Sequence, residues 1–247
     1  MELTQQERLR YARQIMIPEI GEEGQHKIKK ARVFVAGVGG LGSVSSYYLT
    51  AAGVGRLTIV DRDRVDTSNL NRQIIHRTED VGEWKTVSGS RKLESLNPHT
   101  KIVPIRTEIT EENCEALIGD SEIVVDAMDN MKTRRILNAA SVKLGIPYVY
   151  GGVHQIDGMA TVFLPGKTPC LECVFPRPGN ETPSDPPGIL GPAPGLIACI
   201  QSIETIKLIL GMEGILAGRL LCFCGQDMTF REFKITRNPS CPVCGPK

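Results

Sequence analysis

The sequence of 247 residues has no apolar run of the roughly 18 residues that a membrane-spanning helix needs. Its acidic and basic side chains almost cancel, for a formal net charge of +1, so no strong overall field favours nucleic acid or membrane. The first seven residues are polar and acidic, unlike a secretion signal. Internal repeats and low-complexity tails are also missing. These absences predict a cytoplasmic protein that binds neither nucleic acid nor membranes.

Short apolar strands alternate with helix-forming segments over the first 150 residues. The expected strands are 32–36, 57–60, 102–105, 122–126 and 146–150. The expected helices are 4–29, 43–52, 83–96 and 133–144. Such alternation predicts an α/β fold of the Rossmann type, with a doubly wound and mostly parallel sheet.

The pattern changes after Gly151. A strand at 158–164 and a terminal hairpin at 220–223 and 228–235 predict antiparallel strands that extend the sheet. Prolines crowd residues 176–195, which we expect to form a long loop. A strongly apolar helix is expected at 196–210, in the core or at a dimer interface.

A glycine-rich turn, Gly37-x-Gly39-x-x-Gly42, follows the first strand and opens a helix. The first glycine permits the tight turn, the second lets a phosphate approach the backbone, and the third lets the helix pack close to the sheet. Asp61 ends the next strand, where a ribose-binding carboxylate is expected. The alternative is a tight turn without a ligand. The motif predicts a nucleotide but does not distinguish NAD, FAD and ATP.

Three charged residues beyond the strands favour ATP. A triphosphate needs more cations than a pyrophosphate and usually binds magnesium. Arg72 and Lys85 supply cations, and Asp129 follows a buried strand at the sheet edge where ligands bind in α/β folds. Taken singly, the three residues are equally consistent with a surface arginine, a solvated helix lysine and a helix cap.

Together these motifs resemble the ThiF/MoeB/HesA family, relatives of the ubiquitin-activating enzymes. The resemblance covers nearly the whole chain. It rests on Arg10-Tyr11-Ala12-Arg13-Gln14-Ile15, on residues 37–42, 61–63, 68–73 and 82–85, on Asp129-Asn130, and on two cysteine pairs.

The resemblance implies an adenylyltransferase. In this family the C-terminal glycine carboxylate of a ubiquitin-like protein attacks the α-phosphate of ATP, giving an acyl-adenylate and pyrophosphate. The resemblance implies that Arg13, Arg72, Lys85 and Asp129 are catalytic, that Asp129 holds Mg²⁺, and that Arg13 enters the site of the other subunit of a homodimer. The implied nucleotide contacts are Gly37, Gly39, Gly40, Gly42, Asp61, Asp63, Ser68, Asn69, Leu70, Asn71, Arg72, Lys85, Asp129 and Asn130.

Four of the eight cysteines form two Cys-x-x-Cys pairs, Cys170 with Cys173 and Cys241 with Cys244. Two such pairs supply the four thiolates of a closed, tetrahedral zinc site. With all four positions filled by protein, the metal is structural and ties the end of the chain to the domain. The alternative is redox-active pairs or unpaired thiols.

The remaining cysteines and the histidines give weaker signals. Some family members carry a cysteine in the loop after the first zinc pair, but residues 174–195 contain none, which leaves adenylation as the core reaction. Cys199 is expected in the core, and Cys222 and Cys224 are expected to pack on one face of a strand. The four histidines show no metal-ligand spacing and are expected on the surface or in loops.

The leading hypothesis is therefore activation of a sulfur-carrier protein that ends in Gly-Gly. Alternatives are adenylation of a peptide, an NAD-dependent oxidoreductase and a non-catalytic nucleotide-binding scaffold. We expect a single domain over residues 1–247. Its parts are an N-terminal helical segment (1–30), a nucleotide-binding half (31–150) and a carrier-binding and zinc-binding half (151–247).

Overall fold

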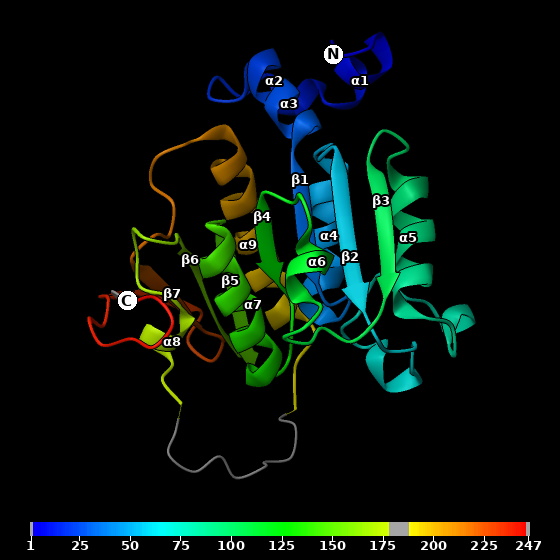
Figure 1. The fold of residues 1–247 in the computed structure, drawn as a ribbon. Coiled ribbons are helices and arrows are strands. Elements are labelled where there is room, and N and C mark those ends of the chain that lie inside the picture. Colours follow the sequence, from blue (N-terminus) through cyan, green and yellow to red (C-terminus); the bar gives the residue numbers. More distant parts are fainter. Residues whose placement is uncertain (1, 178–187, 246–247) are drawn as a thin grey trace.

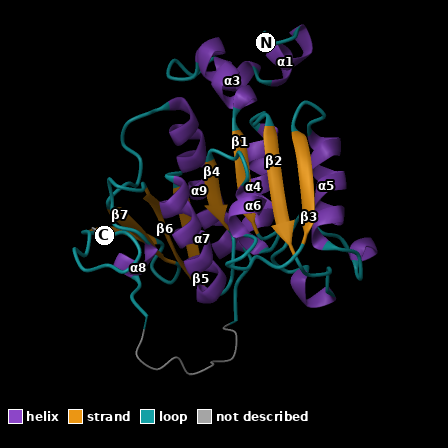
Figure 2. Ribbon diagram, viewed as in Figure 1, coloured by secondary structure: helices purple, strands orange, loops and turns teal. Residues whose placement is uncertain are grey.

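The computed structural model describes residues 2–177 and 188–245 and contains one eight-stranded sheet in the order β3-β2-β1-β4-β5-β6-β7-β8. The strands are β1 (Arg32–Ala36), β2 (Arg56–Asp61), β3 (Lys101–Arg106), β4 (Ile123–Asp126), β5 (Tyr148–His154), β6 (Asp157–Phe163), β7 (Arg219–Cys224) and β8 (Thr229–Lys234). Strands β1 to β5 run parallel, and β6 to β8 continue the sheet antiparallel (Figure 2). The mixed α/β sheet predicted from the sequence is confirmed.

Helices cover both faces of the sheet, and each face has its own apolar cluster (Figure 1). The helices are α1 (Gln5–Arg10), α2 (Ala12–Ile15), α3 (Gly21–Lys30), α4 (Gly40–Ala51), α5 (Lys85–Leu96), α6 (Cys114–Ile118), α7 (Met131–Leu144), α8 (Leu171–Val174) and α9 (Pro192–Leu210). Two short 3-10 helices, Thr67–Asn69 and Thr78–Asp80, lie in the connection between β2 and α5. Helices α4 and α9 pack together on one face, and α6, α7 and α8 cover the other.

The N-terminal segment is helical but not continuous. Residues 4–29 form three short helices rather than one, interrupted at Tyr11 and again at residues 16–20. The Tyr11 ring lies over Gly53, where an added Cβ would be 2.5 Å from the ring. Its hydroxyl accepts a 2.9 Å hydrogen bond from Asn97. The first break therefore coincides with the tertiary packing of Tyr11, and the second break contains Pro18.

Helix α9 begins at Pro192, four residues before the expected start. The expected end of the loop at residue 195 is therefore wrong, because the helix already includes residues 192–195. Proline is tolerated in the first turn of a helix because the backbone N–H there has no helical partner. Residues 178–187 of that loop lie outside the described residues. Helix α9 is long and apolar enough to cross a membrane by length and composition, yet half of its apolar stretch is buried inside the protein. Its packing on α4, β5 and β6 is that of a core helix.

Two short helices, α6 and α8, were not expected from the sequence. Four or five residues are too few for a helical repeat of apolar positions to show. Strand β5 also differs, since it begins at Tyr148 and continues to His154, past the glycine pair at 151 and 152. The pairing of β4 with β5 covers two positions, Val124 with Tyr148 and Val125 with Val149. Beyond these the strands part at their carboxyl ends.

Candidate functional site

A cavity of about 800 Å³ lies at the carboxyl edge of the parallel strands. Glycine-turn residues, the ends of β2 and β4, the 68–73 segment and the start of α7 surround it. The predicted nucleotide contacts that line the cavity are Gly37, Gly39, Gly40, Asp61, Asp63, Ser68, Asn71, Arg72, Lys85, Asp129 and Asn130. The structure therefore brings most of the predicted nucleotide contacts, from both sides of the β1–β4 pair, into one cavity.

The glycine turn has the geometry that its spacing predicts. Gly37 has a φ of +97°, and a Cβ there would lie 2.7 Å from the carbonyl oxygen of Ala127. A Cβ on Gly42 would lie 2.0 Å from the Gly37 carbonyl oxygen, so only glycine lets α4 start this close to β1. Gly42 does not line the cavity, and its role is the close packing of helix and strand.

Asp61, at the end of β2, holds the turn in place. Its Oδ2 accepts a 2.8 Å hydrogen bond from the Val38 N–H, and its Oδ1 accepts one of 2.8 Å from Asp63 N. Burial raises the pKa of Asp61, while the nearby Lys85 charge and the two N–H donors act in the opposite direction. The carboxylate thus already bonds the turn at the position predicted for ribose binding.

The two predicted cations of the cavity are held by local partners. Arg72 Nη1 donates to the Ser68 carbonyl at 2.9 Å and to Asn71 Oδ1 at 3.0 Å. Lys85 Nζ lies 3.0 Å from Asp63 Oδ2, and its side chain is only 7% exposed. The interpretation of Lys85 as a solvated helix residue is therefore wrong. A lysine with this little exposure needs a counter-ion, and here Asp63 supplies it.

Asp129 and Asn130 follow β4 and differ in their contacts. Asn130 is the N-cap of α7, because its side chain accepts a 2.9 Å hydrogen bond from Thr133 N. The alternative interpretation of Asp129 as a helix cap is therefore wrong. The Asp129 carboxylate is exposed on the cavity wall, where its Oδ1 accepts a 3.2 Å hydrogen bond from Asn130. This geometry leaves carboxylate lone pairs open to a cation.

Three predicted site residues besides Gly42 do not line the cavity. Asn69 and Leu70 lie in the turn that precedes Arg72, and Asn69 Oδ1 closes this turn by accepting a 3.1 Å hydrogen bond from Asp66 N. Arg13 is exposed on α2, at the opposite end of the strands from the cavity (Figure 1). Within one chain the structure does not bring Arg13 to the cavity.

A buried ionic cluster beneath the cavity was missed from the sequence. Asp126 is fully buried at the end of β4 and accepts a 2.7 Å hydrogen bond from the Tyr148 hydroxyl. Arg134 Nε lies 3.3 Å from the same Asp126 oxygen, Oδ2, and its Nη2 donates to Gly151 O at 2.8 Å and to Met128 O at 2.5 Å. Arg134 thus bridges the diverging ends of β4 and β5. The sequence places Asp126 only within the expected strand 122–126, although a charged residue that ends a buried strand is itself a signal.

Two glutamines also contribute to the site without having been predicted. Gln201 of α9 donates to Asp126 O at 2.7 Å and to Val149 O at 3.1 Å, which satisfies the backbone where β4 and β5 separate. Gln73 is 5% exposed, lines the cavity, and has no hydrogen-bond partner for its Oε1 among the described residues. Gln73 belongs to the predicted 68–73 motif, but the residue itself was not singled out.

The four cysteines of the two pairs converge, with all their Sγ atoms within 4.8 Å of one another. Cys170 Sγ lies 4.0 Å from Cys173 Sγ and 3.7 Å from Cys241 Sγ, and Cys173 Sγ lies 3.4 Å from Cys244 Sγ. Four sulfurs at zinc–sulfur bond lengths of about 2.3 Å are about 3.8 Å apart in a tetrahedron. The donor set and its spacing fit a tetrahedral zinc ion and bring residues far apart in the chain together.

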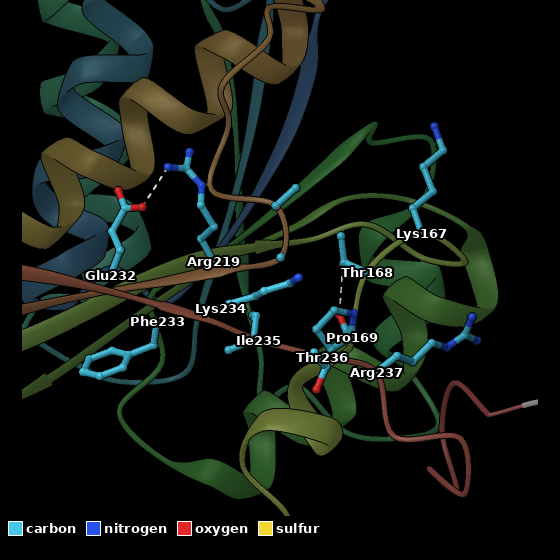
Figure 3. A pocket seen from close by; sticks show the side chains of 12 residues that line it. Lys167, Thr168, Pro169, Arg219, Glu232, Phe233, Lys234, Ile235, Thr236 and Arg237 are labelled. Carbon is cyan, nitrogen blue, oxygen red and sulfur yellow. Dashed lines mark hydrogen bonds and ion pairs between the residues drawn. The ribbon is translucent and has the colours of Figure 1, made fainter.

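The other cysteines and the histidines agree with most of the expectations. Cys114 is buried, and Cys199, Cys222 and Cys224 are half-buried, the last two on one face of β7. His76 lies in a loop, as expected, but is buried, with hydrogen bonds at both ring nitrogens. A second concavity of about 680 Å³ lies between the β6–α8 connection and the end of β8, and contains no predicted site residue (Figure 3).

Known proteins resemble this chain in sequence and in fold. The model of the ThiF family matches residues 11–243. The chain is 41% identical to a sulfur carrier protein adenylyltransferase of Thermus thermophilus, over 99% of this chain and 93% of that protein. It is 41% identical to the SAMP-activating enzyme E1 of Haloferax volcanii, over 96% of this chain and 88% of the relative.

Two further comparisons cover less of the matched proteins. The chain is 44% identical to the adenylyltransferase and sulfurtransferase MOCS3 of Anopheles gambiae, but spans only 56% of its length. Among solved structures, E. coli MccB with MccA-N7isoASN superposes with a TM-score of 0.88 at 23% identity, over 97% of this chain and 75% of that one. At that identity the likeness supports the fold alone.

Proposed function

The chain belongs to the ThiF family, and on that premise we propose that it is an ATP-dependent adenylyltransferase for a ubiquitin-like sulfur-carrier protein. The substrate group is the C-terminal glycine carboxylate of a carrier that ends in Gly-Gly. One observation carries the proposal: Arg72, Lys85 and Asp129 come from three separate segments and line one cavity with the glycine turn. A cavity with both a phosphate-binding turn and these charges suits a triphosphate.

The reaction places two anions in contact. A carboxylate oxygen of the carrier forms a bond to the α-phosphorus, and the bond from that phosphorus to the bridging oxygen of pyrophosphate breaks. The carboxylate is already ionised at neutral pH, so no general base is required. The remaining barrier comes from repulsion between the anions and from the charge that develops on pyrophosphate, and cations fixed in place lower it.

The roles of this chain's residues follow from their positions. The glycine turn and the N-terminus of α4 offer free N–H groups to phosphate oxygens. Arg72 and Lys85 neutralise the phosphates, and Lys85 exchanges or shares its Asp63 contact when it does so. Asp61 binds the ribose. Asp129 holds Mg²⁺, which when bound offsets charge on the triphosphate.

We propose zinc as the metal of the four cysteines. The bound ion closes its coordination sphere with protein sulfurs and is structural rather than catalytic. It joins α8 to the end of the chain, inside the 151–247 half that we assign to carrier and zinc binding. The 1–30 segment and the 31–150 half keep the roles predicted from the sequence.

We also propose a homodimer in which Arg13 enters the site of the partner subunit. Two observations support it: helix α2, which carries Arg13, lies at the opposite end of the strands from the cavity of its own chain, and a stripe of α9 around Ile203 is apolar and not covered by other described residues. Ile203 is 58% exposed, and Leu196, Cys199 and Ile200 beside it are half-buried. Tyr48 of α4, which packs on α9, is 55% exposed.

Mixed dimers test the shared site. Arg13→Ala and Arg72→Ala chains are each expected to be inactive alone. In a heterodimer one site keeps both arginines, so an equal mixture allowed to exchange subunits should regain about a quarter of wild-type activity. An inactive mixture that contains heterodimers would contradict the assignment of Arg13.

The central experiment uses the purified chain, Mg²⁺–ATP and a panel of small Gly-Gly-ending carrier proteins. We expect ATP–pyrophosphate exchange and an acyl-adenylate of the carrier detectable by mass spectrometry. A carrier whose last glycine is removed serves as the matched control and should give neither. Adenylation of a short peptide but of no carrier, or hydride transfer with NAD and no pyrophosphate release, would overturn the proposal. We place the reaction in the cytoplasm, without nucleic acid or membrane.

A further inference from the structure

A buried histidine lies where three nucleotide-binding segments meet. His76 is 5% exposed and follows Arg72 on the same loop. Its Nε2 lies 3.1 Å from the carbonyl oxygen of Val38 in the glycine turn. Its Nδ1 lies 2.9 Å from the hydroxyl of Ser88 in α5, the helix that begins at Lys85. One imidazole therefore contacts the glycine turn and the lysine helix, and is carried by the arginine loop.

The directions of these hydrogen bonds follow from the chemistry of the partners. A carbonyl oxygen only accepts, so Nε2 carries the ring proton and donates it to Val38. Nδ1 is then an acceptor, and the Ser88 hydroxyl donates to it. Ser88 Oγ in turn accepts a 2.8 Å hydrogen bond from Lys92, which is paired with the buried Asp80. The chain of donors runs from Lys92 to the glycine turn, and burial lowers the pKa of His76 to about 4, which keeps the ring neutral.

The peptide units on either side of Val38 are thereby held. Its N–H is bound by Asp61, as described above, and its C=O is bound by His76. Its side chain packs against α5, since a Cβ on Gly89 would lie 3.2 Å from Val38 Cγ1. Contacts at the N–H, the C=O and the side chain restrain shifts of this residue relative to α5. The phosphate-binding turn and Lys85 are accordingly fixed with respect to each other.

We propose that His76 is a positioning residue for ATP: through Val38 and Ser88 it sets the register between the glycine turn, the Arg72 loop and the Lys85 helix. It touches no substrate, since it does not line the cavity. The inference rests on the proposed function, because the register matters for a bound triphosphate. Without the Val38 contact the turn retains its glycines, but its N–H groups and the two cations no longer face the same phosphates.

Two amide substitutions of His76 distinguish the role of its Nε2 donor, which binds Val38, from that of its Nδ1 acceptor, which binds Ser88. The side-chain amide of glutamine extends about as far as Nε2, whereas that of asparagine extends about as far as Nδ1. His76→Gln should keep the bond to Val38, and His76→Asn should lose it. His99→Gln is the matched control, because His99 is a partly exposed loop residue away from the cavity.

The measurement is calorimetric binding of an ATP analogue with a non-cleavable α,β-methylene bridge. We expect His76→Asn to bind at least about tenfold more weakly than wild type, and His76→Gln and the control within about threefold. In exchange assays the loss in His76→Asn should appear mainly as a higher KM for ATP. Equal losses in the asparagine and glutamine variants would show that ring volume matters rather than the donor, and would overturn the inference.

A spectroscopic measurement covers the case in which His76→Asn does not fold. Imidazole ¹⁵N spectra of wild type at neutral pH should show His76 as the Nε2–H tautomer, and Ser88→Ala should weaken that preference while binding the analogue about as well as His76→Gln does. An Nδ1–H tautomer in wild type would overturn the inference. If the wild-type chain does not bind the analogue, the proposed function fails and this inference with it. Binding by wild type and His76→Asn alike refutes the inference alone.

Discussion

Replacement of Arg134 by methionine tests whether the buried ionic cluster holds the carboxyl ends of β4 and β5 together. Methionine keeps much of the apolar stem but removes the guanidinium. The change deprives Asp126 of its cation and the carbonyl groups of Met128 and Gly151 of a donor. Tyr148 remains as a hydrogen-bond donor to Asp126, but it carries no charge to offset the carboxylate.

The expected loss of stability is large. Breaking a buried ion pair by removing one partner costs about 3–5 kcal/mol, because the remaining charge stays buried without compensation. For a chain of this size each kcal/mol lowers the unfolding midpoint by about 2–4 °C, so we expect a decrease of about 6–20 °C. Lys132→Met, an exposed neighbour on α7, is the control and should change stability by less than about 0.5 kcal/mol.

The loss should also depend on pH, with a sign fixed by Asp126. Burial raises the pKa of Asp126, and Arg134 opposes that rise. In the variant only the hydrogen bonds from Met128 N and Tyr148 still oppose the rise in pKa, and no cation does, so the folded state binds the proton more tightly than the unfolded state does. Stability is then lost as the pH rises through the folded pKa, and regained as the pH falls. The deficit of the variant should be smaller at pH 5 than at pH 8.

Urea unfolding of wild type, Arg134→Met, Asp126→Asn and the double variant at both pH values gives the coupling directly. We expect Asp126→Asn to recover part of the loss in the double variant, because it removes the stranded charge. An Arg134→Met protein within 1 kcal/mol of wild type, or a deficit that is the same at pH 5 and pH 8, would refute the electrostatic account.

Three further predictions follow from the site and its supports. Arg72→Ala and Asp129→Ala should each reduce ATP–pyrophosphate exchange by about 100-fold or more while leaving the unfolding midpoint near wild type, and near wild-type exchange in either would remove the assignment. Metal analysis should find one zinc per chain, and Cys241→Ser should lower both zinc content and the unfolding midpoint; full stability without zinc would argue against a structural metal. Gly42→Ala should prevent stable folding, because its Cβ would lie 2.0 Å from Gly37 O. Gly195→Ala in α9 should match or exceed wild-type stability, because a Cβ there meets nothing within 4 Å. Circular dichroism melts compare the two variants, and a stable Gly42→Ala protein would contradict the packing argument.

The alternating strands and helices of the parallel half and most residues around the cavity were predictable because their signals are local. The glycine spacing at 37–42 follows directly from backbone sterics, and Asp61 and Asp129 each follow an apolar strand. The buried partners were not predictable in this way. Arg134 and Gln201 lie on helices with no distinctive spacing, and their importance arises only where β4 and β5 separate.

Boundaries failed where tertiary packing overrode sequence patterns. Tyr11 reads as one more residue of a long helix, yet its ring packs on Gly53 and the helix breaks there. The prolines at 192 and 194 read as loop, yet they occupy the first turn of α9, where a missing N–H does no harm. His76 could not be distinguished from a surface histidine, because Val38 and Ser88 contact it only in the folded chain.

The strand order also bears on how the chain folds as it is synthesised. From β4 onward, the order of strands across the sheet is the same as their order along the chain. Each strand from β4 onward can therefore pair with an earlier strand as soon as it leaves the ribosome, without requiring any later segment. Cys241 and Cys244 follow β8 in the chain, so the proposed zinc site can be completed only after all eight strands have been synthesised.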